Sequence, residues 1–540
     1  MKTIFRLRRF ATLSLILGLM FFGYGGCGDD PVDPNDRTIA PLTVIGIIAN
    51  PKSPAPGDTV LITASIASDS LNTGEFPTLS WTSTGGTLLE SNQLTIRWVA
   101  PLTSQLYTLT VQAANKVSNS SLSHTIFVGE PAMLVPDEAG ELHATAGGDS
   151  IYYLTSPYNP TDALFSGFYV NLYIQGTGSV PVSIAHPGLE YSFSTSLTGA
   201  AHSVLNNLGG FITSQPINIY YDDLVTHTQT QVTFDQMSPV ELRHTQYTTP
   251  AMSADGSLIA YELFFPFVVA GVVDTFDVNL YSLNTSTETN VTARHGVFRK
   301  NYYPTISTDG NWLMFVSDRT AQLVWEYYGL PITAGSVPLD SAAVVRITNT
   351  GGKIGNDLEP AEPMTDWNPD PTVSVLAVTN YQGALYIVDP NAQTHVVVGL
   401  DSKLRDFKWS DSGDFLAAST GANLYIIDYS TGVLGDVDLV YESQPGDIIL
   451  DIAWSRDSNF LIYRVRRSSS IWYELYDHGG STGLTQPVII TSAFAQGSLD
   501  DYLDLMSTRP AWSAAGEVFF LLFGSSTPGL YRLDLSGVIQ

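Results

Sequence analysis

The chain has 540 residues, of which 44% are hydrophobic and 11% aromatic, and this excludes an intrinsically disordered protein while allowing two or more packed domains. Only 14% of the residues are charged, and the formal net charge is −28. A surface with this much negative charge repels the phosphate backbone of nucleic acids and anionic lipid headgroups. We therefore do not expect a nucleic-acid-binding protein.

The N-terminus has the pattern of an export signal. A basic segment, residues 2–9, precedes an apolar segment, residues 10–22, which is short for a transmembrane helix. Gly25 and Gly26 then lead into Cys27, the only cysteine, so an internal disulfide is excluded. This pattern resembles a bacterial lipoprotein signal, and the resemblance implies that Cys27 is lipidated and becomes the new N-terminus. The alternatives are a secretory signal with an incidental cysteine, or an uncleaved anchor.

The segment after the signal is polar and interrupted by prolines. We therefore expect residues 1–26 to be the signal peptide and residues 27–40 to be the lipidated cysteine with an acidic tether. Gly28 stands where the lipoprotein family has an aspartate for inner-membrane retention. The resemblance thus implies a lipid anchor in the outer membrane of the cell envelope, with the periplasmic and surface faces both open.

Residues 41–130 carry short alternating strands separated by turn signals. The strand 59–65 has period 2, the strand 79–82 holds an expected core residue, Trp81, and the strand 107–111 follows after a Gly-Gly turn. About seven such strands without a disulfide predict an immunoglobulin-like β-sandwich. The order of these strands resembles bacterial Ig-like domains of the polycystic-kidney-disease type, which implies a spacer or adhesive module.

Residues 131–540 repeat one phrase, a strand, a tight turn of the form Ser-x-Asp-Gly and a second strand. Self-similarity at roughly 40–60 residues predicts a propeller or another repeat array. The copies span residues 250–256, 304–310, 409–413, 454–458 and 510–516.

The phrase resembles the repeat of TolB-like propellers, which are similar to WD-repeat proteins. That resemblance implies a β-propeller of four-stranded blades over residues 131–540, with seven or eight blades depending on whether residues 140–236 hold one or two. The chain ends soon after the strand 530–534, so we expect a strand within residues 131–142 to complete the last blade and close the ring. The predicted fold class is all-β, a sandwich followed by a propeller.

The residues that recur in each copy of the phrase have structural explanations. Asp255, Asp309 and Asp411 fit the hydrogen bonding of tight turns better than a calcium site. The aromatic residue before the turn, which is tryptophan at 409, 454 and 512, is expected to pack between blades.

Catalytic signatures are present only in unsuitable contexts. Residues 479–483 match Gly-x-Ser-x-Gly, but Pro487 follows where a nucleophile elbow needs a helix. Residues 148–151 echo the Gly-Asp-Ser-Leu motif of lipases, again before a strand. The nine histidines are scattered without zinc spacing and are expected to be mostly exposed. Acidic pairs such as Asp222 and Asp223 suit a glycosidase only if the fold sets two acids at the right separation. We therefore predict no catalytic, cofactor-binding or metal-binding residue and no cofactor.

These observations favour a lipid-anchored binding or scaffold protein, with a protein partner implied by the TolB-like resemblance and a glycan as another possible ligand. The segments 264–276, 319–330 and 351–366 are the candidate binding loops because they are long and aromatic or acidic. The alternatives are a propeller glycoside hydrolase or lyase and a purely structural surface protein. Three or more acids converging at one mouth of the propeller would favour the enzyme.

Overall fold

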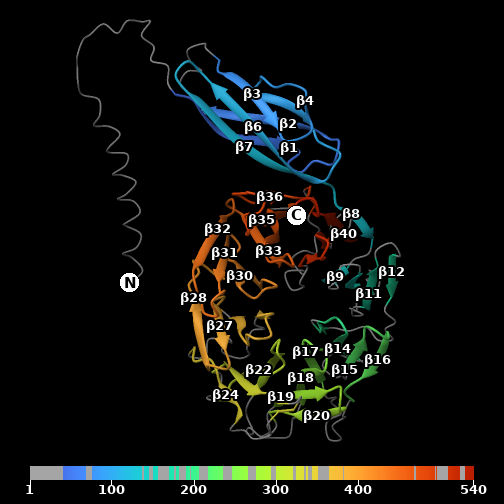
Figure 1. Ribbon diagram of the computed structural model, residues 1–540. Helices are drawn as coiled ribbons and strands as arrows, with labels where there is room; N and C mark the ends of the chain where they lie inside the picture. The colour runs from blue at the N-terminus through green and yellow to red at the C-terminus, as the bar shows by residue number, and fades with distance from the viewer. Residues whose placement is uncertain are drawn as a thin grey trace, which may run out of the picture.

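A computed structural model describes residues 41–67, 76–136, 139–144, 150–155, 169–174, 178–181, 190–194, 196–205, 217–234, 246–265, 275–292, 300–319, 324–333, 336–337, 343–350, 364–380, 382–467, 470–492, 494–495, 509–522 and 529–539. Every named element in these residues is a β-strand. The strands form a small two-sheet unit beside a large ring (Figure 1). The expected signal peptide and Cys27 lie outside the described residues, among which no helix is long and apolar enough to cross a membrane.

The N-terminal unit consists of two antiparallel sheets around one core. One sheet has the order β1 (Thr43–Asn50), β2 (Thr59–Ala67), β5 (Thr95–Val99), β4 (Thr87–Leu88), and the other β3 (Thr78–Ser83), β6 (Gln105–Ala114), β7 (Asn119–Val128). Alternate residues of β2 and β6 are buried, as period-2 strands require. Trp81, predicted to be a core residue, is buried in the same core cluster as Trp98.

The ring begins with two sheets rich in long antiparallel strands. The first is a four-stranded sheet, and the second has eight strands whose two halves meet at a single parallel pair, Ile217 with Gln246. Their strands are β9 (Ala139–Ala144), β10 (Ser150–Thr155), β11 (Tyr169–Ile174), β12 (Gly178–Pro181); then β13 (Glu190–Phe193), β14 (Gly199–Leu205), β15 (Ile217–Asp223), β16 (Thr228–Gln231), β17 (Gln246–Met252), β18 (Leu258–Phe265), β19 (Thr275–Ser282), β20 (Thr287–Asn290).

Five further sheets complete the ring. Four of them follow one another along the chain, and the fifth combines the last three strands with one from the start of the ring. They are β21 (Asn301–Ile306), β22 (Trp312–Ser317), β23 (Glu326–Pro331), β24 (Val345–Arg346); β25 (Thr365–Trp367), β26 (Leu376–Thr379), β27 (Leu385–Asp389), β28 (Thr394–Val398); β29 (Asp406–Trp409), β30 (Phe415–Ser419), β31 (Asn423–Asp428), β32 (Val437–Glu442); β33 (Asp447–Trp454), β34 (Phe460–Arg467), β35 (Ser470–Asp477), β36 (Val488–Ile489), β37 (Phe494–Ala495); and β38 (Ala511–Trp512), β39 (Glu517–Leu522), β40 (Gly529–Asp534), β8 (Ala132–Val135).

The arrangement of these sheets is that of a β-propeller. Successive strands of a sheet pair antiparallel, and the first strand lies toward the centre of the ring with the last on its rim (Figure 1). Closure is as predicted, since β8 pairs with β40 through Leu530 with Val135 and Tyr531 with Met133. The edge that β40 would otherwise expose is therefore covered.

A buried serine organises six of the turns in the ring. Its Oγ accepts a hydrogen bond of 2.9–3.1 Å from the backbone N–H that begins the next strand, which ties the two strands together below the turn. These turn serines are Ser194, Ser253, Ser307, Ser410, Ser455 and Ser513. The copy at Ser194 escapes the sequence motif because Leu197, with φ 51°, takes the place of the glycine that has φ 74° at Gly256.

Asp255 and Asp309 make turn hydrogen bonds, as predicted, whereas Asp411 makes a contact between sheets. Asp255 accepts hydrogen bonds from the Ser253 hydroxyl at 2.6 Å and the Ser257 amide at 3.0 Å. Burial opposes ionisation of this carboxyl, but these hydrogen bonds outweigh it, and the pKa of Asp255 lies below its usual value. Asp411 pairs with Arg456 of the next sheet at 3.1 Å, and no cluster of potential metal ligands occurs in the described part of the chain.

The tryptophans of the phrase join neighbouring sheets, which confirms their predicted packing role. Trp409 and Trp454 are both buried. The indole N–H of Trp454 donates to the carbonyl of Lys408 at 3.0 Å, and that of Trp409 to the carbonyl of Asp366 at 3.1 Å. Each acceptor directly precedes the equivalent tryptophan of the sheet before, so one hydrogen bond repeats from sheet to sheet.

The two-sheet unit packs directly on the ring. Phe127 of β7 is fully buried in a core cluster whose other members come mostly from the sheets of β33–β37 and β38–β40, and Leu106 of β6 packs against the same cluster. This shared core fixes the unit against one side of the propeller (Figure 1).

Candidate functional site

Charged side chains gather on the inner strands of adjacent sheets. The position four residues before the turn serine is Asp406 in β29, Asp451 in β33 and Arg509 just before β38. Three neighbours complete the group, which we call the inner charged cluster: Asp366, Asp406, Lys408, Asp451, Arg464 and Arg509.

Each carboxylate of the inner charged cluster has a cationic partner. Lys408 Nζ lies 2.6 Å from Asp366 Oδ1, and Arg464 Nε lies 2.6 Å from Asp451 Oδ2. Arg509 Nη2 donates to Asp406 Oδ1 and also, at 3.0 Å, to the carbonyl of Phe407. Three acids therefore face three bases, and the cluster has no net charge.

Backbone amides hold the same carboxylates between sheets. Asp366 Oδ2 accepts from the amide of Trp409 at 2.8 Å, and Asp406 Oδ2 accepts from the amide of Ile452 at 2.8 Å. Burial alone would lower the pKa of Arg509, but Asp406, Asp366 and Asp451 outweigh it and hold that pKa above the usual value. General acid catalysis by a carboxyl needs a protonated acid, whereas these acids are bound to cations and N–H donors.

The inner strands also carry backbone strain at one repeated position. Thr249, Tyr303 and Asp451 all lie four residues before a turn serine, beside a β-bulge, and have φ of 46°, 53° and 52°. Such conformations cost roughly 1–3 kcal/mol each for residues other than glycine, and they cluster at functional sites. At Tyr303 the strain is offset by a 2.6 Å hydrogen bond from its amide to Glu262 Oε1 of the preceding repeat. Only Asp451 of these strained residues belongs to the inner charged cluster, because Thr249 lies in β17 and Tyr303 in β21.

A second candidate site lies between the two-sheet unit and the ring. It is a cavity of about 480 Å³, lined by residues 50–53 of the turn after β1 and by side chains from the sheet of β33–β37. This volume falls in the range of small-molecule sites. Sequence reasoning missed it because nothing in the sequence places residues 50–53 against residues far along the chain.

The candidate loops of the sequence are corrected in part. Trp325, Tyr327 and Tyr328 were expected in a binding loop, but they are at most 2% exposed and lie in or beside strand β23. Phe264 and Phe276 stack on each other with ring centroids 4.6 Å apart at the ends of β18 and β19. Residues 266–274, which include Phe267, and residues 320–323 and 351–363 lie outside the described residues.

The rejected catalytic motifs have the expected context where the structure describes them. Ser481 lies in a turn, where its backbone amide donates to Asp477. Strand β36 follows where a nucleophile elbow would have a helix. Ser150 begins β10, while Gly148 and Asp149 lie outside the described residues.

One histidine contradicts the expectation of exposure. His202 is fully buried, with Nδ1 3.1 Å from Oδ2 of the buried Asp222, and its ring stacks on Tyr191 with centroids 4.7 Å apart. Asp223, the other member of the acidic pair, accepts from the amides of Val225 and Thr226 in a turn. The two acids thus have separate structural roles.

No protein-family model matches the chain, and no curated protein matches it. Similar solved structures include the C-terminal WD40 domain of Sif2, with 10% identity and a TM-score of 0.43 over 76% of this chain and 99% of that one. Another is an oligogalacturonate lyase in complex with manganese, with 12% identity and a TM-score of 0.39 over 73% and 98%. A third is dipeptidyl peptidase 4 of Porphyromonas gingivalis, with 12% identity and a TM-score of 0.42 over 71% and 57%. These likenesses concern the fold alone, and we argue nothing about activity or partners from them.

Proposed function

We propose that this chain is a lipid-anchored binding protein of the bacterial cell envelope that docks a protein partner on its propeller. In this proposal Cys27 carries the anchor in the outer membrane, residues 27–40 are the tether, and an Ig-like unit spaces a TolB-like propeller from the membrane. The support for the anchor is the sequence pattern around Cys27, and the support for the spacer is the two-sheet unit that follows.

The observation that carries binding over catalysis is the composition of the inner charged cluster. Three acids converge there, which is the arrangement that would favour a carbohydrate-active enzyme. However, Lys408, Arg464 and Arg509 neutralise them, and backbone amides occupy further carboxylate oxygens. The side chains of Lys408 and Arg509 remain 38% and 30% exposed, so the cluster is not sealed from the surface. A rigid frame with polar groups of fixed position suits recognition.

We propose that this propeller has eight blades. The eight-stranded sheet is taken as two blades because each half has its own turn serine, Ser194 and Ser253, and a single parallel pair joins the halves. Each half then repeats the four-stranded pattern of β21–β24.

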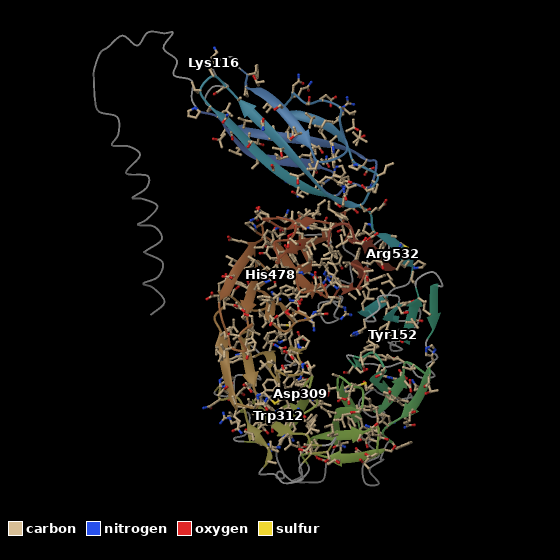
Figure 2. The ribbon with its side chains drawn as sticks, viewed as in Figure 1. Lys116, Tyr152, Asp309, Trp312, His478 and Arg532 are labelled. Atoms are coloured by element: carbon tan, nitrogen blue, oxygen red, sulfur yellow. The ribbon has the colours of Figure 1, made fainter. Side chains whose placement is uncertain are left out.

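The test is a pull-down from bacterial membranes expressing the full chain, with three variants beside it. Cys27→Ala removes the lipidation site, Lys408→Gln alters the inner charged cluster, and Lys116→Gln is the control. Lys116 lies at the end of the two-sheet unit away from the ring (Figure 2). We expect one protein partner with the wild type and the control, loss of that partner with Lys408→Gln, and release from the membrane with Cys27→Ala. Membrane retention of Cys27→Ala would refute the lipid anchor, and recovery of envelope glycans without protein would refute the docking function.

A further inference from the structure

The cavity between the two-sheet unit and the ring exists because an outer strand is interrupted. β36 pairs with β35 at Glu474 and Leu475, and β37 pairs with β35 at Ser470 and Ile471. Between these pairs the outer segment bulges, since the Ile490 amide donates to the Tyr473 carbonyl at 3.0 Å and the Tyr473 amide donates to the Thr491 side chain at 3.0 Å, and Trp472 lies beside this bulge. The turn of residues 50–53 covers this bulge from the two-sheet unit and completes the cavity of about 480 Å³.

Trp472 offers an indole plane of fixed orientation. Its Nε1 donates to Glu474 Oε1 at 3.1 Å, and the Oε2 of the same buried carboxyl accepts from the hydroxyl of Tyr463 at 2.9 Å. The guanidinium of Arg467 lies over the indole ring, 5.3 Å from its centroid. Because these contacts hold the half-buried ring, little rotational freedom is lost when a ligand packs against it.

Two cations line the cavity in an otherwise strongly acidic protein. Arg467 binds both carboxylate oxygens of Asp447 through Nε and Nη2, which leaves Nη1 outside that pair. Lys52 is exposed and forms no salt bridge with the residues that the structure describes. Both are thus positioned to meet an anionic group, at the edge of an aromatic surface.

Hydroxyl groups complete the lining. Ser470, Thr491 and Ser492 contribute from the ring side, and Asn50 adds an amide from the turn after β1. Ser53 is buried, and its Oγ has no hydrogen-bond partner within the described part of the molecule. A ligand that suits this lining has an apolar face, several hydroxyls and a negative charge.

We propose that this cavity binds an acidic saccharide, with a pyranose ring against Trp472 and its carboxylate at Lys52 and Arg467. A pyranose presents a face of C–H groups that packs on an aromatic ring, and its hydroxyls match the serines and threonine of the wall. This site is separate from the inner charged cluster, so it stands independently of the protein-docking function.

The experiment is calorimetric titration of the full chain carrying Cys27→Ala, which avoids the lipid. The probes are short oligosaccharides of galacturonic, glucuronic and mannuronic acid, and sialyllactose, each beside its neutral counterpart. We expect at least one acidic probe to bind, its neutral counterpart to bind at least about tenfold more weakly, and the affinity to fall as salt is raised.

Variants locate the site. Trp472→Ala and Lys52→Gln should each weaken the acidic probe at least about tenfold, and Trp472→Phe should retain part of the affinity because it keeps an aromatic ring. The matched controls Trp312→Ala and Lys116→Gln should bind as the parent does. Trp312 has a hydrogen-bonded indole too, with its Nε1 2.8 Å from Asn391, but lies on the side of the ring opposite the two-sheet unit (Figure 2).

Several results would overturn the proposal. These are failure of every acidic probe to bind, equal affinity for acidic and neutral probes, and binding that survives both Trp472→Ala and Lys52→Gln. Thermal melting of each variant separates loss of binding from loss of folding. Capture of an acidic peptide in place of the saccharides would also refute it and assign the cavity to protein recognition.

Discussion

Phe127→Ala tests whether the two-sheet unit and the propeller form one cooperative structure. Phe127 belongs to β7 of the N-terminal unit, yet it is fully buried in a core cluster whose other members belong to the ring, including Val488, Leu535 and Val538. Truncation of a fully buried phenylalanine costs about 3–5 kcal/mol. The loss should therefore fall on the propeller, although the substitution lies outside it.

The expected size of the effect follows from the length of the ring. At about 2.1 cal/mol/K per residue, a propeller of about 400 residues unfolds with an entropy near 0.8 kcal/mol/K, so about 4 kcal/mol lowers its Tm by roughly 5 °C. Differential scanning calorimetry of Phe127→Ala measures this shift. Phe76→Ala, at a phenylalanine that is 83% exposed in the same unit, is the control and should change the Tm by less than about 1 °C.

A second substitution checks the same contact from its other side. A Cβ at position 129 would overlap the Phe127 ring, so Gly129→Ala should displace that ring and lower the propeller Tm in the same direction. An unchanged propeller transition in Phe127→Ala, with only a separate transition of the N-terminal unit affected, would refute a shared core.

Three further predictions concern the repeats. Ser455→Ala leaves the amide of Phe460 without its 2.9 Å acceptor, so urea unfolding should show a loss of about 1–3 kcal/mol, against less than about 0.5 kcal/mol for the exposed Ser481→Ala. Arg464→Met removes the cation that lies 2.6 Å from Asp451 Oδ2 and should cost about 3–5 kcal/mol, whereas the double variant with Asp451→Asn should recover most of that loss. Equal losses in the single and double variants would contradict the ion pair. Asp309 has a folded-state pKa below its usual value, because hydrogen bonds from Ser307, Ser374 and Asn311 outweigh the opposing effect of burial. The ionised Asp309 therefore stabilises the folded protein fully above the unfolded pKa of about 3.9, and this contribution is lost as the pH falls through the lower folded pKa. The difference in free energy of unfolding between wild type and Asp309→Asn should thus be larger at pH 7 than at pH 2.5. A difference that does not change with pH would contradict this.

Much of the fold could be predicted from the repeated phrase because turn chemistry is local. A serine, an aspartate and a glycine spaced as Ser-x-Asp-Gly between two apolar segments favour a tight hairpin, and the large apolar tryptophan before them favours a buried position. The copy at Ser194 was missed because Leu197 adopts the left-handed conformation that glycine usually supplies. Trp325 and Tyr327 were placed in a loop because their segment has the length of an insertion, but a buried strand holds them.

The candidate sites were harder to predict because they depend on how separate repeats lie against each other. Asp406, Asp451 and Arg509 share one position relative to the turn serine, and alignment of the repeats on that serine would have found them. Their pairing could not be predicted in this way, because Arg509 and Asp406 are 103 residues apart in the sequence. The buried partnership of His202 with Asp222 likewise depends on the register of β14 against β15.

The pairing of β8 with β40 also makes closure of the ring depend on two segments roughly 400 residues apart in the sequence. Until this pair forms, a ring of otherwise folded sheets has two open edges, each with unpaired N–H and C=O groups that can pair with another chain. Formation of the pair therefore ends a period of exposure, and substitutions that weaken β40 should lower the yield of folded protein.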